Sequence, residues 1–532
     1  MPGLLHEFIL HSAEIHPTNP ALTHKKSTRD YAALADHIQR AAQGFLRLGL
    51  SRGERVAVYL PKQMETVDSL FGASLAGGVF VPINPLLKAE QVGHILRDCN
   101  VRILVTATLR ATQLAEILAQ CHDLNHVIIV DNSSGLPDIP GVDCTGWNAL
   151  DAQHTLHTPH ARIDTDMAAI LYTSGSTGRP KGVVLSHRNM VAGAESVAQY
   201  LGNTADDRLL AVLPFSFDYG LSQLTTAFRV SASAVLMDYL LPRDIVRAVT
   251  KHGITGLAAV PPLWTQIADL PWPTEAQASL RYITNSGGAL PRTTLAALQT
   301  ALPNTKPVLM YGLTEAFRST YLPPEELARR PESMGRAIPN AEVMVVREDG
   351  SPCAPGEPGE LVHRGSLVAM GYWNDAERTA ERFRPAPGQE SGMPLPEIAV
   401  WSGDTVKIDE DGYLYFIGRK DDMIKTSGYR ISPTEVEETL YASGLIDQAV
   451  ALGIPHPSLG QAIVAVVTSK DTSNTAEFDS DAILQYCKQH LPAFMVPAHI
   501  QVQASLPRNP NGKIDRKQLT HELQGLLQEN SR

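Results

Sequence analysis

Residues 172–182, YTSGSTGRPKG, carry side chains suited to binding phosphate rather than to packing in a core. Glycine lets backbone N–H groups approach phosphate oxygens closely. Serine and threonine hydroxyls donate hydrogen bonds, and Lys181 adds a compact positive charge. The segment is not a Walker loop, because Pro180 precedes the lysine and a strand-like segment follows instead of a helix. The residue types and spacing therefore predict a loop that binds the phosphates of a nucleotide.

The whole string Thr-Ser-Gly-Ser-Thr-Gly-x-Pro-Lys-Gly resembles the phosphate loop of the AMP-forming adenylating superfamily. That superfamily includes acyl- and aryl-CoA synthetases, adenylation domains of non-ribosomal peptide synthetases, and firefly luciferase. Its other motifs follow here in the same order, so the resemblance covers essentially the whole chain. The resemblance implies that the chain binds ATP and Mg²⁺ and activates a carboxylic acid as an acyl-adenylate. It assigns to the nucleotide Thr173, Ser174, Gly175, Ser176, Thr177, Gly178 and Lys181, with Thr173 and Lys181 also catalytic.

The segment MYGLTEA at 310–316 resembles the Tyr-Gly-x-Thr-Glu motif of the superfamily. By that resemblance Tyr311 stacks on adenine beside Gly312, Thr314 contacts the α-phosphate, and Glu315 holds Mg²⁺ as a catalytic group. An aromatic face suits a base, and a hard carboxylate oxygen suits magnesium. NSGGAL at 285–290 resembles the loop beside the adenine in the superfamily. That resemblance implies that the backbone at Gly287 and Gly288 approaches the base or the acyl group.

Residues 401–419 resemble the Tyr-x-Thr-Gly-Asp motif and the Gly-Arg pair that follows it, with Trp401 and Ser402 replacing the usual Tyr and Thr. Asp404 is expected to accept hydrogen bonds from both ribose hydroxyls, because an ionised carboxylate only accepts them. Arg419 is expected to lie against the ribose and the phosphate.

The C-terminal part resembles the mobile unit of the superfamily. LPRNPNGKIDRKQL at 506–519 implies that Lys513 reaches the α-phosphate and the carboxylate during adenylation. Asp421 occupies the hinge position, where a few backbone dihedral angles absorb a large rotation between the two half-reactions. In relatives the next segment enters the site for the thiol step, and here it carries Lys425, Gly428, Arg430 and Glu435.

The acid pocket is predicted around VLPFSFDYGLSQL at 212–224. Phe217 stands near the position where many acyl-CoA synthetases have His. Asp218 resembles the aspartate that binds the α-amino group in amino-acid adenylating domains, although it could instead begin the next helix. Arg318 lies on the active-site side of Glu315 if that segment is helical, and it pairs with Asp218, binds an acid group of the substrate, or points to solvent. Trp264 either lines the pocket or belongs to the core.

Alternating strand-like and helix-like segments surround these motifs and predict an α/β fold. Strands are expected at 55–60, 77–84, 101–107, 126–131, 167–172, 208–214, 233–238, 256–262, 281–287 and 307–312. From about residue 340 alternating strands with Gly/Pro turns indicate a small antiparallel sheet or barrel. We expect an N-terminal adenylate-forming domain at 1–419, with two parallel-sheet α/β subdomains plus the β-barrel, and a small mobile α+β domain at 420–532.

Composition limits the functional classes further. The net charge of −11 argues against a general nucleic-acid binder, since no basic excess neutralises phosphates. The five cysteines are scattered and never spaced as CxxC, which predicts neither a disulfide framework nor a zinc site. The start lacks the pattern of a signal peptide, and no apolar run approaches the ~18 residues of a membrane span. We therefore expect a cytoplasmic protein without a membrane span.

Two hypotheses share the same activation chemistry. The first is an AMP-forming ligase, closest to freestanding acyl-CoA ligases, that transfers the acyl group of a carboxylic acid to CoA. The second transfers an amino acid or another acid to the phosphopantetheine of a carrier protein, and Asp218 favours it slightly. A luciferase-like oxygenase and a non-catalytic nucleotide-binding regulator are further alternatives. Intact Lys513, Glu315 and Asp404 argue against the regulator.

Overall fold

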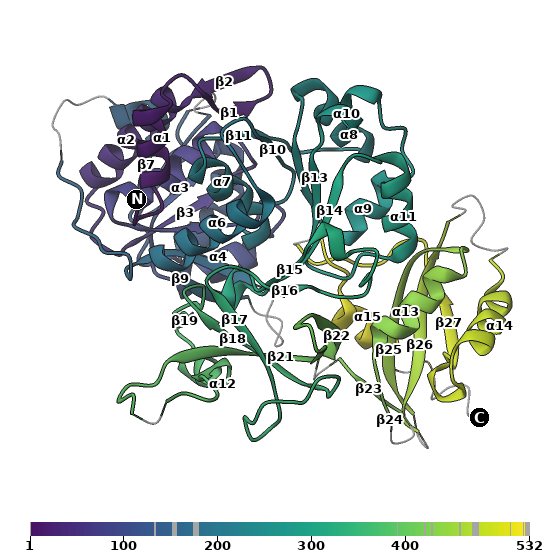
Figure 1. The fold of residues 1–532 in the computed structure, drawn as a ribbon. Coiled ribbons are helices and arrows are strands. Elements are labelled where there is room, and N and C mark those ends of the chain that lie inside the picture. The colour runs from purple at the N-terminus through teal and green to yellow at the C-terminus, as the bar shows by residue number, and fades with distance from the viewer. Residues whose placement is uncertain are drawn as a thin grey trace.

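The chain forms two large sheets wrapped by helices and two smaller sheets further along the sequence (Figure 1). The computed structural model describes residues 2–131, 135–151, 157–173, 180–390, 392–419, 422–426, 429–456, 459–470, 478–510, 512–524 and 526. Within these ranges no helix has both the length and the apolar character that crossing a lipid bilayer requires.

In the described part of the chain, the first sheet has eight strands in the order β19-β9-β8-β4-β3-β5-β6-β7. Neighbouring strands from β8 to β7 run parallel, whereas β9 and β19 at one edge are antiparallel to their neighbours. The strands are β3 (Arg55–Tyr59), β4 (Val79–Pro82), β5 (Val101–Thr106), β6 (His126–Ile129), β7 (Asp143–Gly146), β8 (Met167–Thr173), β9 (Lys181–Ser186) and β19 (Gly371–Tyr372). The helices that accompany this sheet are α2 (Tyr31–Arg47), α3 (Met64–Ala76), α4 (Ala89–Asp98), α5 (Thr108–Leu118) and the 3₁₀ turn η1 (Trp147–Asp151).

The second sheet has nine described strands in the order β16-β15-β14-β13-β12-β10-β11-β1-β2. They are β1 (Pro20–His24), β2 (Ser27–Asp30), β10 (Arg208–Ala211), β11 (Ser233–Leu236), β12 (Gly256–Ala259), β13 (Tyr282–Asn285), β14 (Lys306–Tyr311), β15 (Thr320–Leu322) and β16 (Arg336–Ala337). The strands from β1 to β14 run parallel, with antiparallel strands only at the edges. Its helices and 3₁₀ turns are α1 (Glu7–Ile15), α6 (His187–Leu201), α7 (Asp218–Arg229), α8 (Pro242–His252), α9 (Pro261–Ala268), α10 (Thr274–Ser279), α11 (Arg292–Ala301), η2 (Thr314–Ala316) and η3 (Pro324–Glu326).

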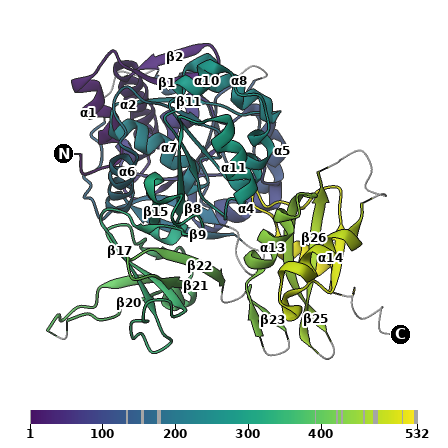
Figure 2. The same ribbon diagram turned by 45° about the vertical axis from the view of Figure 1, so that its right-hand side comes forward.

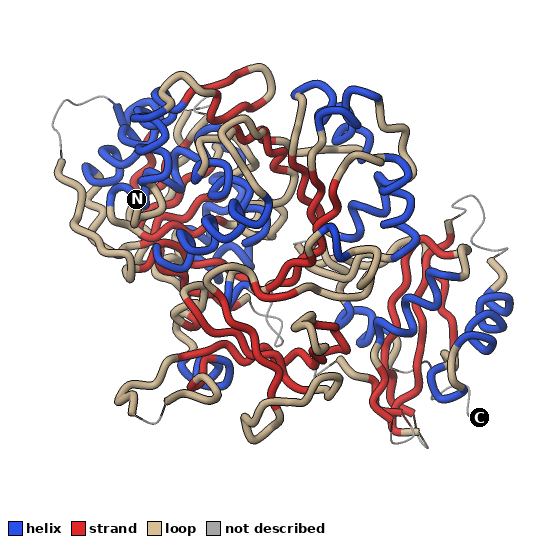
Figure 3. Tube along the Cα trace, in the orientation of Figure 1, coloured by secondary structure: helices blue, strands red, loops and turns tan. Residues whose placement is uncertain are grey.

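One apolar core joins the two large sheets. It contains Val56 of the first sheet and Leu209 of the second, together with residues of the helices around them. Phe71 of α3 meets Phe228 of α7 edge to face, with ring centroids 5.3 Å apart. Because each helix buries one side against its own sheet and another against the opposite helix, the two sheets are fixed relative to each other. The strands expected from the sequence are confirmed, and Figure 3 shows the two strand layers with helices beside them.

The third and fourth sheets follow as separate small layers. The third consists of antiparallel strands β17 (Ala341–Val346), β18 (Gly359–Gly365), β20 (Phe383–Pro385), β21 (Ile398–Ile408) and β22 (Leu414–Arg419), with α12 (Ala376–Arg382) beside it. The fourth consists of β23 (Ile424–Thr426), β24 (Tyr429–Ile431), β25 (Ile446–His456), β26 (Gly460–Ser469) and β27 (His499–Val502), with α13 (Pro433–Ala442), α14 (Ser480–His490), η5 (Ala493–Met495) and α15 (Arg516–Glu522). Figures 1 and 2 place both small sheets at the same end of the large ones.

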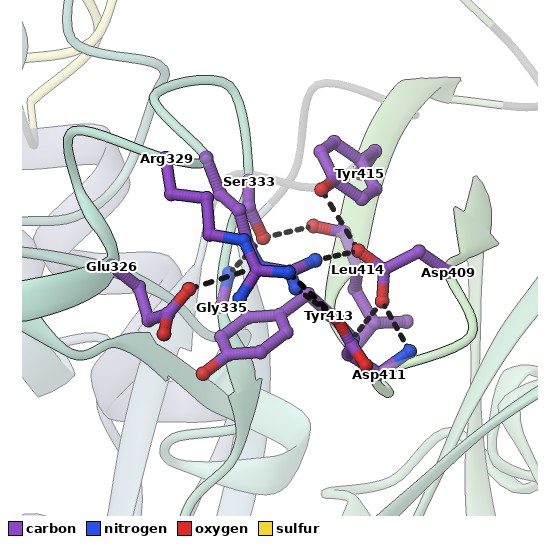
Figure 4. Close-up of polar contacts among 10 residues, drawn as sticks. Glu326, Arg329, Ser333, Gly335, Asp409, Asp411, Tyr413, Leu414 and Tyr415 are labelled. Carbon is purple, nitrogen blue, oxygen red and sulfur yellow. Dashed lines mark hydrogen bonds and ion pairs between the residues drawn. The ribbon is translucent and has the colours of Figure 1, made fainter.

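An arginine ties the third sheet to the second. Arg330, whose side chain is 8% exposed, donates hydrogen bonds to the carboxylates of Glu326, Asp409 and Asp411. Beside it the Ser333 hydroxyl donates to the Leu414 carbonyl at 2.8 Å (Figure 4). These contacts clamp the β21–β22 hairpin onto the segment that follows η3. The clamp matters for function because β21 and β22 carry two of the residues expected to bind the nucleotide.

Candidate functional site

The expected site residues gather where strands of both large sheets end. Thr173 ends β8, Phe217 follows β10, Gly287 follows β13 and Gly312 follows β14. In open sheets with parallel strands, ligands bind at the carboxyl ends of the strands. Thr173 faces Lys181 across the β8–β9 pair, so the two residues close the base of the predicted phosphate loop. The loop positions Ser174, Gly175, Ser176, Thr177 and Gly178 lie outside the described residues.

Lys181 and Glu315 form an ion pair at this edge. The Lys181 ammonium lies 3.1 Å from Glu315 Oε1, and the Tyr372 hydroxyl lies 2.7 Å from the ammonium and 2.6 Å from the same Oε1. Burial lowers the pKa of Lys181 although Glu315 opposes it. Burial raises the pKa of Glu315, but the positive charge of Lys181 and the hydrogen bond from Tyr372 bring it below its usual value. The site therefore contains an ionised carboxylate at neutral pH.

The donor set suits a magnesium ion that is shared with substrate phosphates. The hydrogen bonds from Lys181 and Tyr372 to Glu315 both end on Oε1, so neither uses Oε2. In the described part of the chain no three His, Cys, Asp or Glu side chains cluster as a metal cage. Magnesium is commonly bound by one or two carboxylates together with nucleotide phosphates rather than by an all-protein cage. Glu315 fits that arrangement.

Asp404 and Tyr311 form a second polar centre. The Tyr311 hydroxyl donates to Asp404 Oδ2 at 2.5 Å, and Arg419 Nε lies 3.3 Å from Asp404 Oδ1. Despite that ion pair, Asp404 Oδ1 is buried without a hydrogen-bond partner among the described residues. Burial raises the pKa of Asp404, although Arg419 and Tyr311 lower it in part. A buried acceptor without a donor is suited to a hydroxyl of a bound ligand.

Lys513 reaches this centre from the C-terminal part. A Cβ at Gly287 would lie 3.1 Å from Lys513 Cε, and the Lys513 ammonium lies 5.4 Å from the ring of Phe217. Gly287 also has φ +84°, a conformation that favours glycine. Burial lowers the pKa of Lys513, and Arg419 lowers it further. The amide of Asn84 donates to the carbonyl of Pro510 at 2.6 Å and anchors the lysine loop.

The remaining nucleotide residues lie close to these groups along the chain. Gly288 accepts a hydrogen bond at its carbonyl from the Asn285 amide at 3.0 Å, next to Gly287. Thr314 begins η2, which also carries Glu315. Buried hydroxyl or amide oxygens without a partner among the described residues also line this region, at Thr173, Ser216 and Asn285. Their shared lack of partners marks the region as built for a polar ligand.

Asp218 and Arg318 pair in the predicted acid pocket. Arg318 Nη1 donates to Asp218 Oδ2 at 2.8 Å, and the two side chains are 2% and 5% exposed. Of the three alternatives for Arg318, the structure shows the pair with Asp218. The segment after Glu315 does not continue as a helix, because Phe317 adopts φ 55° and ends the short turn η2. This left-handed residue redirects the chain so that Arg318 enters the interior. Asp218 begins α7, which is favourable for a carboxylate at a helix N-terminus.

The sequence left open whether Trp264 lines the acid pocket or belongs to the core, and the structure places it in the core. Its side chain is fully buried, and its indole N–H lies 3.1 Å from the Ala259 carbonyl and 3.2 Å from the Thr284 carbonyl. It therefore belongs to the core of the second sheet. Phe217, by contrast, contacts the site through Lys513 and meets Tyr219 edge to face.

The residues expected at the hinge and in the thiol step are only partly described. Asp421 and Gly428 lie outside the described residues. Lys425 lies in β23 and Arg430 in β24, where only the backbone is described. Glu435 lies in the first turn of α13. The hinge and thiol-step assignments remain predictions.

Two polar residues of the site were not singled out from the sequence. Tyr372 contacts Lys181 and Glu315 from the edge strand β19, whose two residues, Gly371 and Tyr372, show no motif. Asn84 follows β4 and bonds to a loop more than 400 residues later. A signal for Asn84 exists in the sequence, since a polar residue directly after a buried parallel strand lies at the binding edge of the sheet.

Comparison with known families agrees with this geometry. A family model described as AMP-binding enzyme matches residues 9–373, and one described as AMP-binding enzyme C-terminal domain matches residues 435–513. The chain belongs to the AMP-binding enzyme family. This AMP-binding enzyme is 27% identical to a long-chain-fatty-acid–CoA ligase of Salmonella typhimurium, over 98% of its own length and 94% of the relative. It is 29% identical to an L-proline–[L-prolyl-carrier protein] ligase of Pseudomonas fluorescens, over 98% of its own length and 100% of the relative.

Other relatives extend beyond this chain or share its whole fold. A linear gramicidin synthase of Brevibacillus parabrevis is 30% identical over 97% of this chain, which spans about 10% of that much longer protein. The crystal structure of ATP-bound MatB from Rhodopseudomonas palustris superposes with a TM-score of 0.86 at 25% identity, over 99% of this chain and 100% of that one. The AMP-binding enzyme therefore has the adenylate-forming fold, with a large N-terminal and a small C-terminal part.

Proposed function

We propose that this AMP-binding enzyme is an AMP-forming acid–thiol ligase that activates a small carboxylic acid with ATP and transfers the acyl group to CoA. The proposal rests on one observation: the side chain of Lys513 lies close to Gly287 and to the ring of Phe217. A lysine from the C-terminal part thereby reaches the ends of the strands that carry the nucleotide motifs.

In the first half-reaction, a carboxylate oxygen of the acid attacks the α-phosphorus of ATP. The new bond joins that oxygen to phosphorus, and the bond to the bridging oxygen breaks so that pyrophosphate leaves. Two anions approach each other, so Lys513 and Lys181 offset their repulsion and stabilise the charge that develops. Magnesium, when bound through Glu315, would neutralise phosphate charge. The site needs no covalent enzyme intermediate.

The nucleoside is bound by the second polar centre. The open Oδ1 of Asp404 accepts a ribose hydroxyl, Arg419 lies on the ribose and phosphate side, and Tyr311 offers a ring for the adenine. Glycines 287, 288 and 312 let the backbone approach the ligand. The loop from Thr173 to Lys181 surrounds the phosphates.

In the second half-reaction, the thiolate of CoA attacks the acyl carbon, a thioester forms and AMP leaves. Lys513 would have to withdraw to admit the thiol. We therefore assign residues 1–419 to an N-terminal domain and residues 420–532 to a mobile C-terminal domain with a hinge at Asp421. In support, β22 of the third sheet ends at Arg419, and β23 of the fourth begins at Ile424. Lys425, Gly428 and Arg430 then serve the thiol step.

A cytoplasmic location is part of the proposal. All five cysteines are unpaired, which suits a reducing compartment.

The test is pyrophosphate exchange into ATP with a broad panel of fatty, aryl, hydroxy and amino acids. Exchange that depends on one class of acid supports the ligase, and no exchange with any acid refutes it. Thioester formation with CoA is then compared with loading of a phosphopantetheinylated carrier protein. Preference for the carrier would replace CoA with the alternative acceptor.

A further inference from the structure

Arg318 presents an unused hydrogen-bonding edge inside the acid pocket. Its Nη1 donates to Asp218 Oδ2 at 2.8 Å and to the Phe317 carbonyl at 2.7 Å. Its Nε and Nη2 are buried without a hydrogen-bond partner among the described residues. These two nitrogens lie on one edge of the planar guanidinium, where their N–H groups point in the same direction. A buried donor pair without an acceptor calls for an oxygen from a ligand or from water.

Arg318 lines a small cavity with a volume of about 10 Å³. Polar groups of Tyr219, Ser222, Thr226 and Thr284 line it together with the apolar side chains of Val197, Leu201, Leu209 and Met310. Such a space accepts about one oxygen-sized group. Two of its lining residues are direct sequence neighbours of site residues, since Tyr219 follows Asp218 and Met310 precedes Tyr311.

The charge balance selects among possible substrate groups. Asp218 already neutralises Arg318, so an ammonium group of an amino acid would compete with the guanidinium for the same carboxylate. A second carboxylate would bring an additional negative charge into the interior, which is costly without another cation. A plain alkyl tail would leave both N–H groups unsatisfied. An uncharged oxygen satisfies both N–H groups and leaves the charge balance unchanged.

We propose that the Nε–Nη2 edge of Arg318 selects a short oxo or hydroxy acid, whose uncharged oxygen accepts hydrogen bonds from both N–H groups. The inference rests on the proposed ligase function and names its substrate class. Asp218 is then a positioning residue, which orients Arg318 and does not bind an α-amino group. Long unbranched fatty acids are poor substrates, because an alkyl chain would leave the Nε–H and Nη2–H groups of Arg318 without an acceptor.

The experiment compares matched acids by pyrophosphate exchange. The panel pairs 4-oxopentanoate with pentanoate, and 3- and 4-hydroxybutanoate with butanoate, and it adds glutarate, 4-aminobutanoate and alanine. We expect kcat/KM for the best oxygen-bearing acid to exceed that of its alkyl partner by about 10²-fold or more. An equal or better rate with the alkyl, dicarboxylic or amino acids overturns the inference but leaves the ligase function intact. No exchange with any acid overturns both.

Arg318→Lys separates this role from a structural one. Lysine keeps a positive charge beside Asp218 but lacks the paired N–H edge. We expect the selectivity for the oxygen-bearing acid over its alkyl partner to fall at least tenfold, mainly through a higher KM for the oxygen-bearing acid. Arg229→Lys is the matched control, because Arg229 lies on α7, the helix that Asp218 begins, pairs with Glu195 and is absent from the cavity lining.

A second variant covers a possible folding defect of the first. Arg318→Met combined with Asp218→Asn removes both buried charges together, so neither is left unpaired. We expect the same loss of selectivity in this double variant. Unchanged selectivity in either folded variant overturns the inference.

Discussion

Lys513→Ala is expected to change stability and rate in different ways. Among the described residues, no carboxylate oxygen lies within ion-pair distance of the Lys513 ammonium, and burial lowers the pKa of Lys513. Burial therefore disfavours the lysine charge before substrates bind, and Asp218, Asp404 and Glu315 offset this only in part. The loop is held through the backbone of Lys513, whose N–H donates to the side-chain oxygen Oδ1 of Asn509 at 3.0 Å and whose carbonyl accepts from the Asn509 N–H at 2.8 Å. Alanine retains both bonds, so we expect Tm to stay the same or to rise slightly.

The rate effect follows from the single charged donor that is lost. Lys513 is positioned to stabilise charge on the α-phosphate and the attacking carboxylate only while the acid reacts. Removing one such preorganised donor typically costs about 10²–10³-fold in rate, or about 2.7–4 kcal/mol. We expect a loss of at least this size in adenylate formation. Attack of the thiol on a finished adenylate does not use Lys513 and is expected to proceed at the normal rate.

Two assays separate the half-reactions. Pyrophosphate exchange measures adenylation, and single-turnover thioester formation from a synthetic acyl-adenylate measures the second step. Lys517→Ala, an exposed lysine in α15, is the matched control and should affect neither. Equal losses in both half-reactions, or a Tm lowered by several degrees, would refute the reasoning, because either result would show that Lys513 supports the fold or the whole site.

Three further results are expected. Tyr372→Phe removes the hydroxyl that bonds to Glu315 at 2.6 Å and to Lys181 at 2.7 Å, so exchange should fall about tenfold with an unchanged circular dichroism spectrum; an unaltered rate would remove Tyr372 from the site. Because burial lowers the pKa values of Lys181 and Lys513, kcat/KM should decline as pH rises through a pKa below 10.5; a flat profile up to pH 10.5 would contradict this. Burial lowers the pKa of His363 from 6.5 to about 4, so folding stability should drop by about 3 kcal/mol between pH 6.5 and 4 from this group alone. As the pH falls, His363 is protonated in the unfolded chain before it is protonated in the folded one, which favours unfolding. Urea titrations should therefore show a weaker pH dependence of the free energy of unfolding for His363→Gln than for the unaltered protein. An identical pH dependence would exclude His363 as a cause of the stability loss.

Local chemistry could be predicted from the sequence with little ambiguity. Short runs of apolar residues between turns identify strands such as β3, β5 and β13, because strand formation depends on neighbouring side chains and their burial. The phosphate-loop composition around Lys181 predicts its function for the same reason: glycine, hydroxyl and ammonium groups act through properties that each residue carries alone. Short motifs likewise identify Tyr311, Glu315 and Asp404 as candidate site residues.

Contacts between distant segments were decided only by the tertiary structure. Tyr372 reaches Lys181, 191 residues earlier, because β19 pairs with β9 and aligns Tyr372 with Val183. Arg318 reaches Asp218 across 100 residues because a left-handed residue redirects the chain. A residue pattern specifies that a strand forms, whereas strand order and side-chain pairing depend on how whole sheets share one core. The sequence by itself thus determined that this enzyme activates an acid with ATP, and the packing of its sheets decided which side chains meet at the candidate site.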